Sequence, residues 1–136
     1  MFKSTATSRP AGVLASTRPT ILLVDDDPAL GRTLSRALES SGYNVVIAET
    51  AAEAQAKTKE VAPDLILLDL ILPDTDGLML AMSLNTTSQA PIIICSARHD
   101  LVDQALGRRL GAADFVAKPF DLDALEVRIA RLLGES

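Results

Sequence analysis

Five short apolar runs, each followed by a helical pattern, constrain the fold of this 136-residue chain more than any other feature. The runs cover residues 21–24, 45–47, 65–68, 92–95 and 115–117. Each is apolar at successive positions, as strands buried on both faces are. Between the first two runs, Leu30, Leu34 and Leu38 recur every four residues and indicate one face of a helix. Strands that alternate with helices predict an α/β fold, a three-layer, doubly wound (βα)5 sandwich around a parallel five-stranded sheet.

Local signals predict where the helices begin and end. Asp27 followed by Pro28 is typical of a helix cap and first helical residue. Thr50 and Glu53 have the spacing of a capping box for the second helix. Further helices are expected over residues 78–84, 100–110 and 122–132. Met79 and Met82, in the third helix, are expected to be packing residues.

Composition limits the classes of function. Apolar residues make up 48% of the chain, which suits one folded domain, and we expect it over residues 19–134 after a flexible leader, residues 1–18. The net charge of −5 disfavours direct nucleic-acid binding. No apolar run approaches the ~18 residues of a membrane span. The single cysteine, Cys95, has no internal disulfide partner and indicates a reducing, cytoplasmic location.

Polar side chains follow the apolar runs at four of the five strand ends. The residues at these positions are Asp25, Asp26 and Asp27 after the first run, Asp69 after the third, Ser96 after the fourth and Lys118 after the fifth. In doubly wound folds, ligands bind at the carboxyl ends of the strands. The sequence therefore predicts that these side chains form one site.

The chemistry of this set is that of phosphoryl transfer. Clustered carboxylates repel one another unless a cation offsets their charge, and oxygen ligands suit Mg²⁺. Asp69 can act as a nucleophile toward a phosphoryl group. Lys118 supplies positive charge for phosphoryl oxygens, and Ser96 supplies a hydroxyl donor. Together they predict a site for phosphorylation of Asp69.

Four segments in order resemble the receiver domains of response regulators, the signalling proteins of bacterial two-component systems. These segments are residues 21–27, 67–77, 95–97 and 111–120. The resemblance extends over residues 20–133 and implies the flavodoxin-like strand order 2-1-3-4-5. It also implies a phosphorylation-switched signalling domain and not an enzyme, since such a domain catalyses only its own phosphorylation and slow dephosphorylation.

The resemblance assigns a role to each site residue. Asp69 would accept phosphate from a sensor histidine kinase or a phosphotransfer protein. Asp26 would bind Mg²⁺ directly and Asp25 partly through water, with Asp69 and the backbone carbonyl of Ile71 as further ligands. Lys118, before a cis-proline, would contact the phosphoryl group.

Ser96 and Phe115 resemble the switch residues of the family. Phe115 would turn inward as Ser96 moves toward the phosphoryl group, and a plain core role for Phe115 stays open. The surface of the fourth helix, fifth strand and fifth helix would then change and control an effector domain or a downstream protein.

At other positions of that surface, this sequence differs from relatives that dimerise there through charged side chains. Gln104, Ala113 and Ala124 stand where such charges are frequent, so we expect a weak homodimer at most. Because Ser136 closely follows the last helix, we expect a receiver that stands alone or has been separated from an effector domain.

Two other functions fit parts of the sequence. A hydrolase of the haloacid-dehalogenase kind would use Asp74 and Asp76 as its two carboxylates, but Pro73 precedes them where that class has a buried strand. A receiver that serves only as an interaction surface would lack a site residue, and none is missing.

Overall fold

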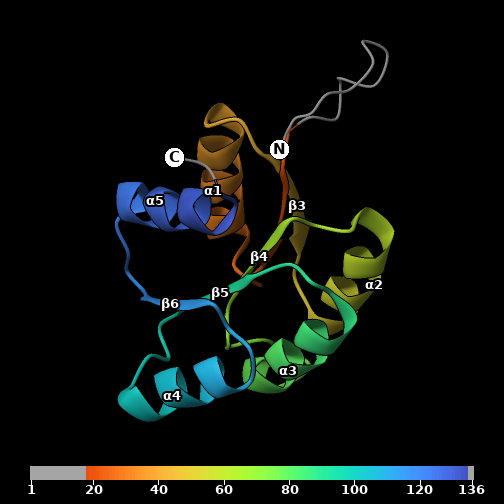
Figure 1. Cartoon of the computed structure of the whole chain (residues 1–136), viewed down its shortest axis with the longest axis vertical. Coiled ribbons are helices and arrows are strands. Elements are labelled where there is room, and N and C mark those ends of the chain that lie inside the picture. Colours follow the sequence, from red (N-terminus) through yellow and green to blue (C-terminus); the bar gives the residue numbers. More distant parts are fainter. Residues whose placement is uncertain (1–17, 135–136) are drawn as a thin grey trace.

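The computed structural model describes residues 18–134, and these form one parallel sheet with helices on both faces (Figure 1). The elements along the chain are β2 (Thr20–Val24), α1 (Pro28–Ser40), β3 (Asn44–Ala48), α2 (Ala51–Val61), β4 (Leu65–Leu68), α3 (Gly77–Thr87), β5 (Ile92–Ser96), α4 (Leu101–Arg109), β6 (Asp114–Ala117) and α5 (Leu122–Leu132). The strand order is β3-β2-β4-β5-β6, so the sequence-based prediction of the fold and its order 2-1-3-4-5 is confirmed.

The sheet separates two apolar cores. Figure 1 shows α1 and α5 on one face and α2, α3 and α4 on the other. Alternate residues of each strand point to opposite faces. In β2, Ile21 and Leu23 pack with Leu34 of α1, whereas Leu22 and Val24 pack on the side of α2 and α3. Burial of both faces explains why the strands read as unbroken apolar runs.

The helix caps are largely those that the sequence predicts. The Asp27 carboxylate accepts hydrogen bonds from the N–H groups of Ala29 and Leu30 at the start of α1. The Thr50 hydroxyl accepts one from the Glu53 N–H, but the Glu53 carboxylate accepts from the Glu49 N–H and not from Thr50. The predicted capping box is therefore only half formed.

Two predictions about α3 were wrong. The helix runs to Thr87, three residues beyond the expected end at Leu84, and the Ser88 N–H closes it on the Leu84 carbonyl. Met79 and Met82 are 56% and 41% exposed and do not belong to the core. The inner face of α3 is filled by other residues, namely Leu78, Leu80, Ala81 and Leu84.

Two further observations concern the start of the described chain and the length of its helices. The predicted leader lies outside the described residues except for Arg18, whose guanidinium donates to the carbonyl of Glu39 in the last turn of α1 and to that of Gly42 just beyond the helix. Among residues 18–134, no helix is long and apolar enough to cross a membrane.

Candidate functional site

The strand ends carry the predicted site residues to one edge of the sheet. Val24 of β2 pairs with Leu68 of β4, so Asp25 and Asp69 follow neighbouring strands at the same level. The backbone pairing continues one residue further, because the Asp69 N–H donates to the Val24 carbonyl at 2.9 Å. Lys118 follows β6 and donates its N–H to the carbonyl of Ser96, the last residue of β5, at 3.0 Å.

Asp69 is held by donors at both of its carboxylate oxygens. Oδ1 accepts hydrogen bonds from the Ser96 hydroxyl at 2.8 Å and from the Ile71 N–H at 3.0 Å. Oδ2 accepts from the Lys118 ammonium group at 3.0 Å. Asp69 is only 6% exposed. These contacts fix the orientation of a nearly buried carboxylate at the end of the central strand.

Lys118 joins the two buried acids. Its ammonium nitrogen lies 2.6 Å from Asp25 Oδ2 in addition to its contact with Asp69. Burial disfavours the charged lysine, but hydrogen bonds to Asp25 and Asp69 and their charges outweigh that effect and raise the pKa of Lys118. The peptide bond between Lys118 and Pro119 is cis, as expected.

The carboxylates of Asp25, Asp26 and Asp69 form one acidic cluster. One oxygen of each lies within 4.8 Å of the others. Asp25 is buried and Asp26 is exposed, so the cluster opens to solvent on one side. Burial raises the pKa of the Asp25 carboxyl above its usual value, although hydrogen bonds from Lys118 and from the Asp27 N–H act against this.

The charge of this cluster fits a divalent cation. When all three carboxylates are ionised, the single ammonium of Lys118 leaves an excess of two negative charges. Carboxylate oxygens are hard ligands of the kind that Mg²⁺ takes. Ile71 lies beside the cluster through its N–H bond to Asp69, with its side chain 52% exposed.

The other aspartates near the site act as caps. Asp27 caps α1, and Asp76 caps α3 through a bond from the Leu78 N–H. Asp74 accepts hydrogen bonds from the N–H groups of Ala51 and Ala52 at the start of α2. These bonds lower the pKa values of Asp74 and Asp76. Their structural use removes the observation that favoured a two-carboxylate hydrolase.

Sequence reasoning missed Arg98. Its guanidinium pairs with Asp76 at 3.1 Å and with Asp103 of α4 at 3.0 Å. The backbone N–H of Arg98 donates to the Ser96 hydroxyl oxygen at 3.1 Å. Arg98 therefore connects the Ser96 hydroxyl to the start of α3 and to α4. An isolated arginine in a predicted loop carries no periodic signal that would have revealed this.

Phe115 is a buried residue of β6. It is 8% exposed and belongs to the core on the side of α2, α3 and α4. Gly107 of α4 lies directly over it, since a Cβ there would sit 3.5 Å from the Phe115 ring. Phe115 is thus a core residue, and its action as a switch stays a prediction.

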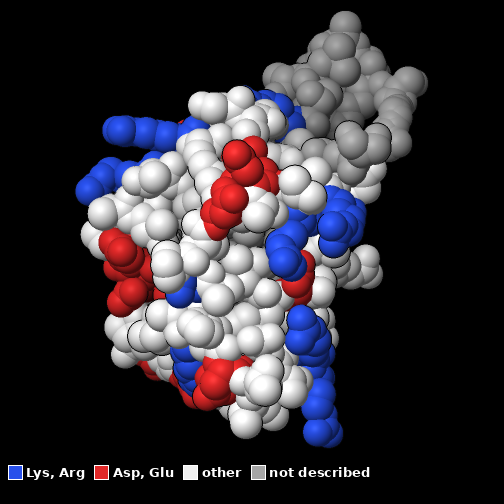
Figure 2. All heavy atoms as spheres, turned by 90° about the vertical axis from the view of Figure 1, so that its left-hand side faces the viewer, with Lys and Arg blue, Asp and Glu red and all other residues white. Residues whose placement is uncertain are grey.

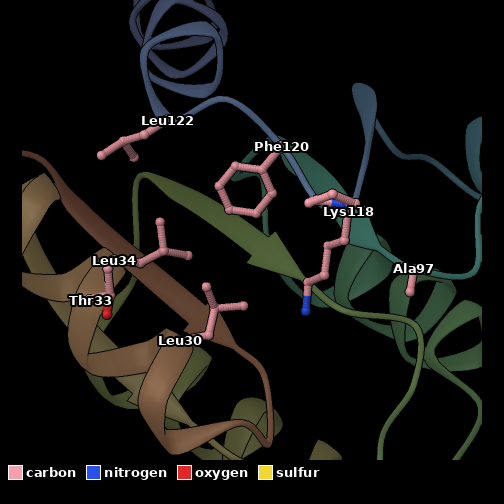
Figure 3. A pocket seen from close by; sticks show the side chains of 8 residues that line it. Leu30, Thr33, Leu34, Ala97, Lys118, Phe120 and Leu122 are labelled. Atoms are coloured by element: carbon pink, nitrogen blue, oxygen red, sulfur yellow. The ribbon is translucent and has the colours of Figure 1, made fainter.

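An apolar surface pocket adjoins the site, between α1 and the segment that follows β6 (Figure 3). Its volume is about 500 Å³. The residues that line it are Leu30, Thr33 and Leu34 of α1, Ala97 after β5, and Lys118, Pro119, Phe120 and Leu122 after β6. Lys118 therefore belongs both to the pocket and to the acidic site.

Comparisons with known proteins agree with this geometry. A sequence model of the family described as the response regulator receiver domain matches residues 21–130. The DNA-binding response regulator MtrA of Mycolicibacterium smegmatis is 40% identical over 85% of this chain and 51% of its own length. The transcriptional regulatory protein TrcR of Mycobacterium tuberculosis is 38% identical over 85% of this chain and 46% of its own length.

Solved structures show the same likeness. The non-phosphorylated receiver domain of HemR from Leptospira biflexa has a TM-score of 0.79 and 38% identity, covering 88% of this chain and 97% of that one. The chain spans about half the length of the curated relatives it matches. The chain belongs to the receiver domain family of the two-component response regulators, a family of signalling domains.

Proposed function

We propose that Asp69 accepts a phosphoryl group and that its phosphorylation switches this receiver domain. The observation that carries the proposal is the double contact on Asp69, with Ser96 on one carboxylate oxygen and Lys118 on the other. A structural carboxylate needs neither a half-buried lysine shared with a second acid nor an open acidic side. A nucleophile that must receive a dianionic group needs both.

The proposed reaction is a displacement at phosphorus. The proposed donor is a phosphohistidine of a sensor histidine kinase or phosphotransfer protein. A carboxylate oxygen of Asp69 forms a bond to phosphorus while the phosphorus–nitrogen bond of the donor breaks, and its electron pair stays on the imidazole nitrogen. Lys118 already contacts Asp69. In this proposal it would also contact the phosphoryl oxygens. Ser96 would transfer its hydrogen bond from the carboxylate to a phosphoryl oxygen.

Magnesium is the proposed cofactor, held by Asp25, Asp26, Asp69 and the carbonyl of Ile71. The excess of negative charge in the acidic cluster supports this assignment. When bound, the ion would neutralise charge on the carboxylates and on the phosphoryl oxygens. Without a cation, the cluster would repel a dianionic donor, so phosphorylation is expected to depend on Mg²⁺.

Arg98 supports a path from Asp69 to the surface of α4, β6 and α5. Ser96 accepts the hydrogen bond of the Arg98 N–H, and the Arg98 side chain holds Asp103 of α4. A shift of Ser96 toward a phosphoryl group would therefore pull on the segment that holds α4. Phe115, packed beneath Gly107, would adjust to the same movement. We propose that this surface controls an effector domain or a downstream protein.

The charge of the same surface argues against direct contact with nucleic acid. Figure 2 shows acidic and basic side chains interspersed with uncharged surface on the side of α4, β6 and α5. The chain as a whole has a net charge of −5. We propose a cytoplasmic protein whose partners are proteins, with at most a weak homodimer.

Acetyl phosphate tests the proposal, with the intact mass of the protein as the readout. In the presence of Mg²⁺, the chain is expected to gain the mass of one phosphoryl group, and Asp69→Asn is expected to gain none. Asp123→Asn, at an exposed position of α5, is the matched control and is expected to behave as the parent. No adduct on the parent chain would favour a receiver that serves only as an interaction surface.

A further inference from the structure

The apolar pocket beside Asp69 has a charged end and an apolar body. Lys118 is the charged residue of its lining, and its ammonium nitrogen is 3.0 Å from Asp69 Oδ2. Thr33 supplies the other polar side chain, and the remaining lining side chains are apolar. A ligand that matches both ends carries an anionic group at Lys118 and an apolar group away from it.

The shape of the pocket supports the same match. Figure 3 shows Leu30 and Leu34 of α1 facing Phe120 and Leu122, with the Lys118 side chain extending beside them. The volume of about 500 Å³ lies in the range of small-molecule sites. Ala97 follows Ser96 directly and also lines the pocket, so the pocket adjoins the site on both the Lys118 and the Ser96 side.

We propose that this pocket binds the acyl chain of an acyl phosphate that donates its phosphoryl group to Asp69. The inference rests on the proposed function of Asp69 and specifies a class of small-molecule donor for it. Acyl phosphates join the two required parts in one molecule, since a dianionic phosphoryl group adjoins an acyl chain. A longer acyl chain would place more apolar surface in this pocket than acetyl does.

The transfer step is balanced without a further reactant. A carboxylate oxygen of Asp69 forms a bond to phosphorus, and the bond between phosphorus and the acyl oxygen breaks. The electron pair of that bond leaves with the acyl group, which departs as a carboxylate. One dianionic acyl phosphate and one carboxylate thus give one aspartyl phosphate and one carboxylate, and no proton is transferred.

Burial of the acyl chain should make the phosphorylation rate depend on the length of that chain. Each buried methylene group contributes a gain in binding of about fourfold. Because this gain holds in the transition state as in the bound state, it raises the rate at low donor concentration. Butyryl phosphate has two more methylene groups than acetyl phosphate, so complete burial would raise the rate about 15-fold, and burial of most of the chain about tenfold.

The experiment compares acetyl, butyryl and hexanoyl phosphate as donors to the parent chain with Mg²⁺. The rate of Asp69 phosphorylation is measured at low donor concentration by intact mass, and phosphoramidate, which has no acyl chain, serves as the reference donor. We expect a rise of about tenfold from acetyl to butyryl phosphate. Equal rates for the three acyl phosphates would overturn the proposal and leave the pocket to a protein partner.

Two variants locate the effect. Leu30→Asn places an amide in the pocket and is expected to bring the butyryl-to-acetyl ratio close to one. Leu106→Asn, a leucine on α4 that is 40% exposed and does not line the pocket, is the matched control and should keep the parent ratio. An unchanged butyryl-to-acetyl ratio in folded Leu30→Asn would contradict the assignment of the acyl chain to this pocket. The donor series on the parent chain tests the dependence on chain length without any variant.

The outcomes separate this inference from the function on which it rests. Phosphorylation by acetyl phosphate and phosphoramidate without dependence on chain length would leave the proposed function of Asp69 intact and remove the acyl pocket. The absence of any phosphorylated product would overturn both proposals.

Discussion

The Ser96 hydroxyl donates a 2.8 Å hydrogen bond to Asp69 from the neighbouring strand, and both side chains are buried. The hydroxyl oxygen also accepts the Arg98 N–H at 3.1 Å. One small side chain therefore links the carboxylate of the proposed phosphoryl acceptor to the backbone that leads into α4.

Removal of this hydroxyl should weaken the fold. Ser96→Ala leaves the Arg98 N–H and one lone pair of Asp69 without their partner, and we expect the free energy of unfolding to fall by about 1–2 kcal/mol. Urea denaturation measures the change. Ser88→Ala, which removes a half-exposed hydroxyl at the end of α3, should cost less, and equal losses would contradict the importance of the buried bond.

Asp25 should destabilise the fold at neutral pH when no divalent cation is bound. Its folded-state pKa is raised by burial, so its ionisation weakens folding as pH rises past the ordinary value of 3.8. In buffer with a chelator, Asp25→Asn is expected to raise the free energy of unfolding at pH 7. The gain should disappear as pH falls below 3.8, where Asp25 is protonated in both states.

Magnesium should stabilise the parent chain relative to Asp25→Asn, the opposite of the difference expected in a chelator. Because a ligand of the folded state stabilises it, Mg²⁺ is expected to raise the melting temperature of the parent chain and to have less effect on Asp25→Asn. Asp27→Asn is the matched control, since asparagine caps a helix as well as aspartate does. An equal response to Mg²⁺ in the parent chain and in Asp25→Asn would remove Asp25 from the proposed ligands.

Gly77 holds the segment after Asp69 in place. A Cβ at this position would lie 2.3 Å from the Leu70 Cα and 2.6 Å from its carbonyl oxygen, so the backbone next to Asp69 would have to move. We expect Gly77→Ala to lower the free energy of unfolding by about 3 kcal/mol or more. The variant should also phosphorylate more slowly than the parent, as intact mass would reveal.

Gly31 offers the control for that variant. A Cβ there would meet Ile47 side-chain carbons at 3.5 Å and beyond, which is ordinary contact, in the interior of α1. Gly31→Ala is expected to leave stability unchanged or to raise it by up to about 1 kcal/mol. If both substitutions lowered the free energy of unfolding by similar amounts, the loss would come from replacing a helical glycine and not from the contact with Leu70.

Arg98 should restrain α4. Arg98→Gln removes the ion pairs to Asp76 and to Asp103, which is itself 8% exposed and would lose its charged partner. We expect faster amide hydrogen exchange across α4 in the variant, with α1 unchanged. Arg109→Gln, at an exposed position of the same helix, is the control, and equal exchange in both variants would contradict the coupling.

The sequence allowed the fold and the candidate site to be predicted because two signals mark four of the five strand ends. An apolar run of three or four residues ends, and a candidate site residue follows at once, as Asp25 and Asp69 do. In a parallel sheet, this order in the sequence becomes proximity in space. The distances among Lys118, Asp25 and Asp69 then follow from the register of the strands.

Features that depend on packing between distant segments could not be predicted in this way. The exposure of Met79 and Met82 was missed because α3 is apolar on more than one face, so periodicity does not identify its buried side. The contacts of Arg98 and the pocket between α1 and Phe120 join segments that no local pattern relates.

Identification of the phosphorylated residue tests the central claim most directly. After reaction with acetyl phosphate and Mg²⁺, borohydride reduces an aspartyl phosphate to homoserine, which peptide mass spectrometry locates in the sequence. Homoserine is expected at position 69 and nowhere else. Homoserine at Asp25, Asp26 or Asp27 in place of Asp69, or none in the chain, would contradict the assignment of Asp69 as the phosphoryl acceptor.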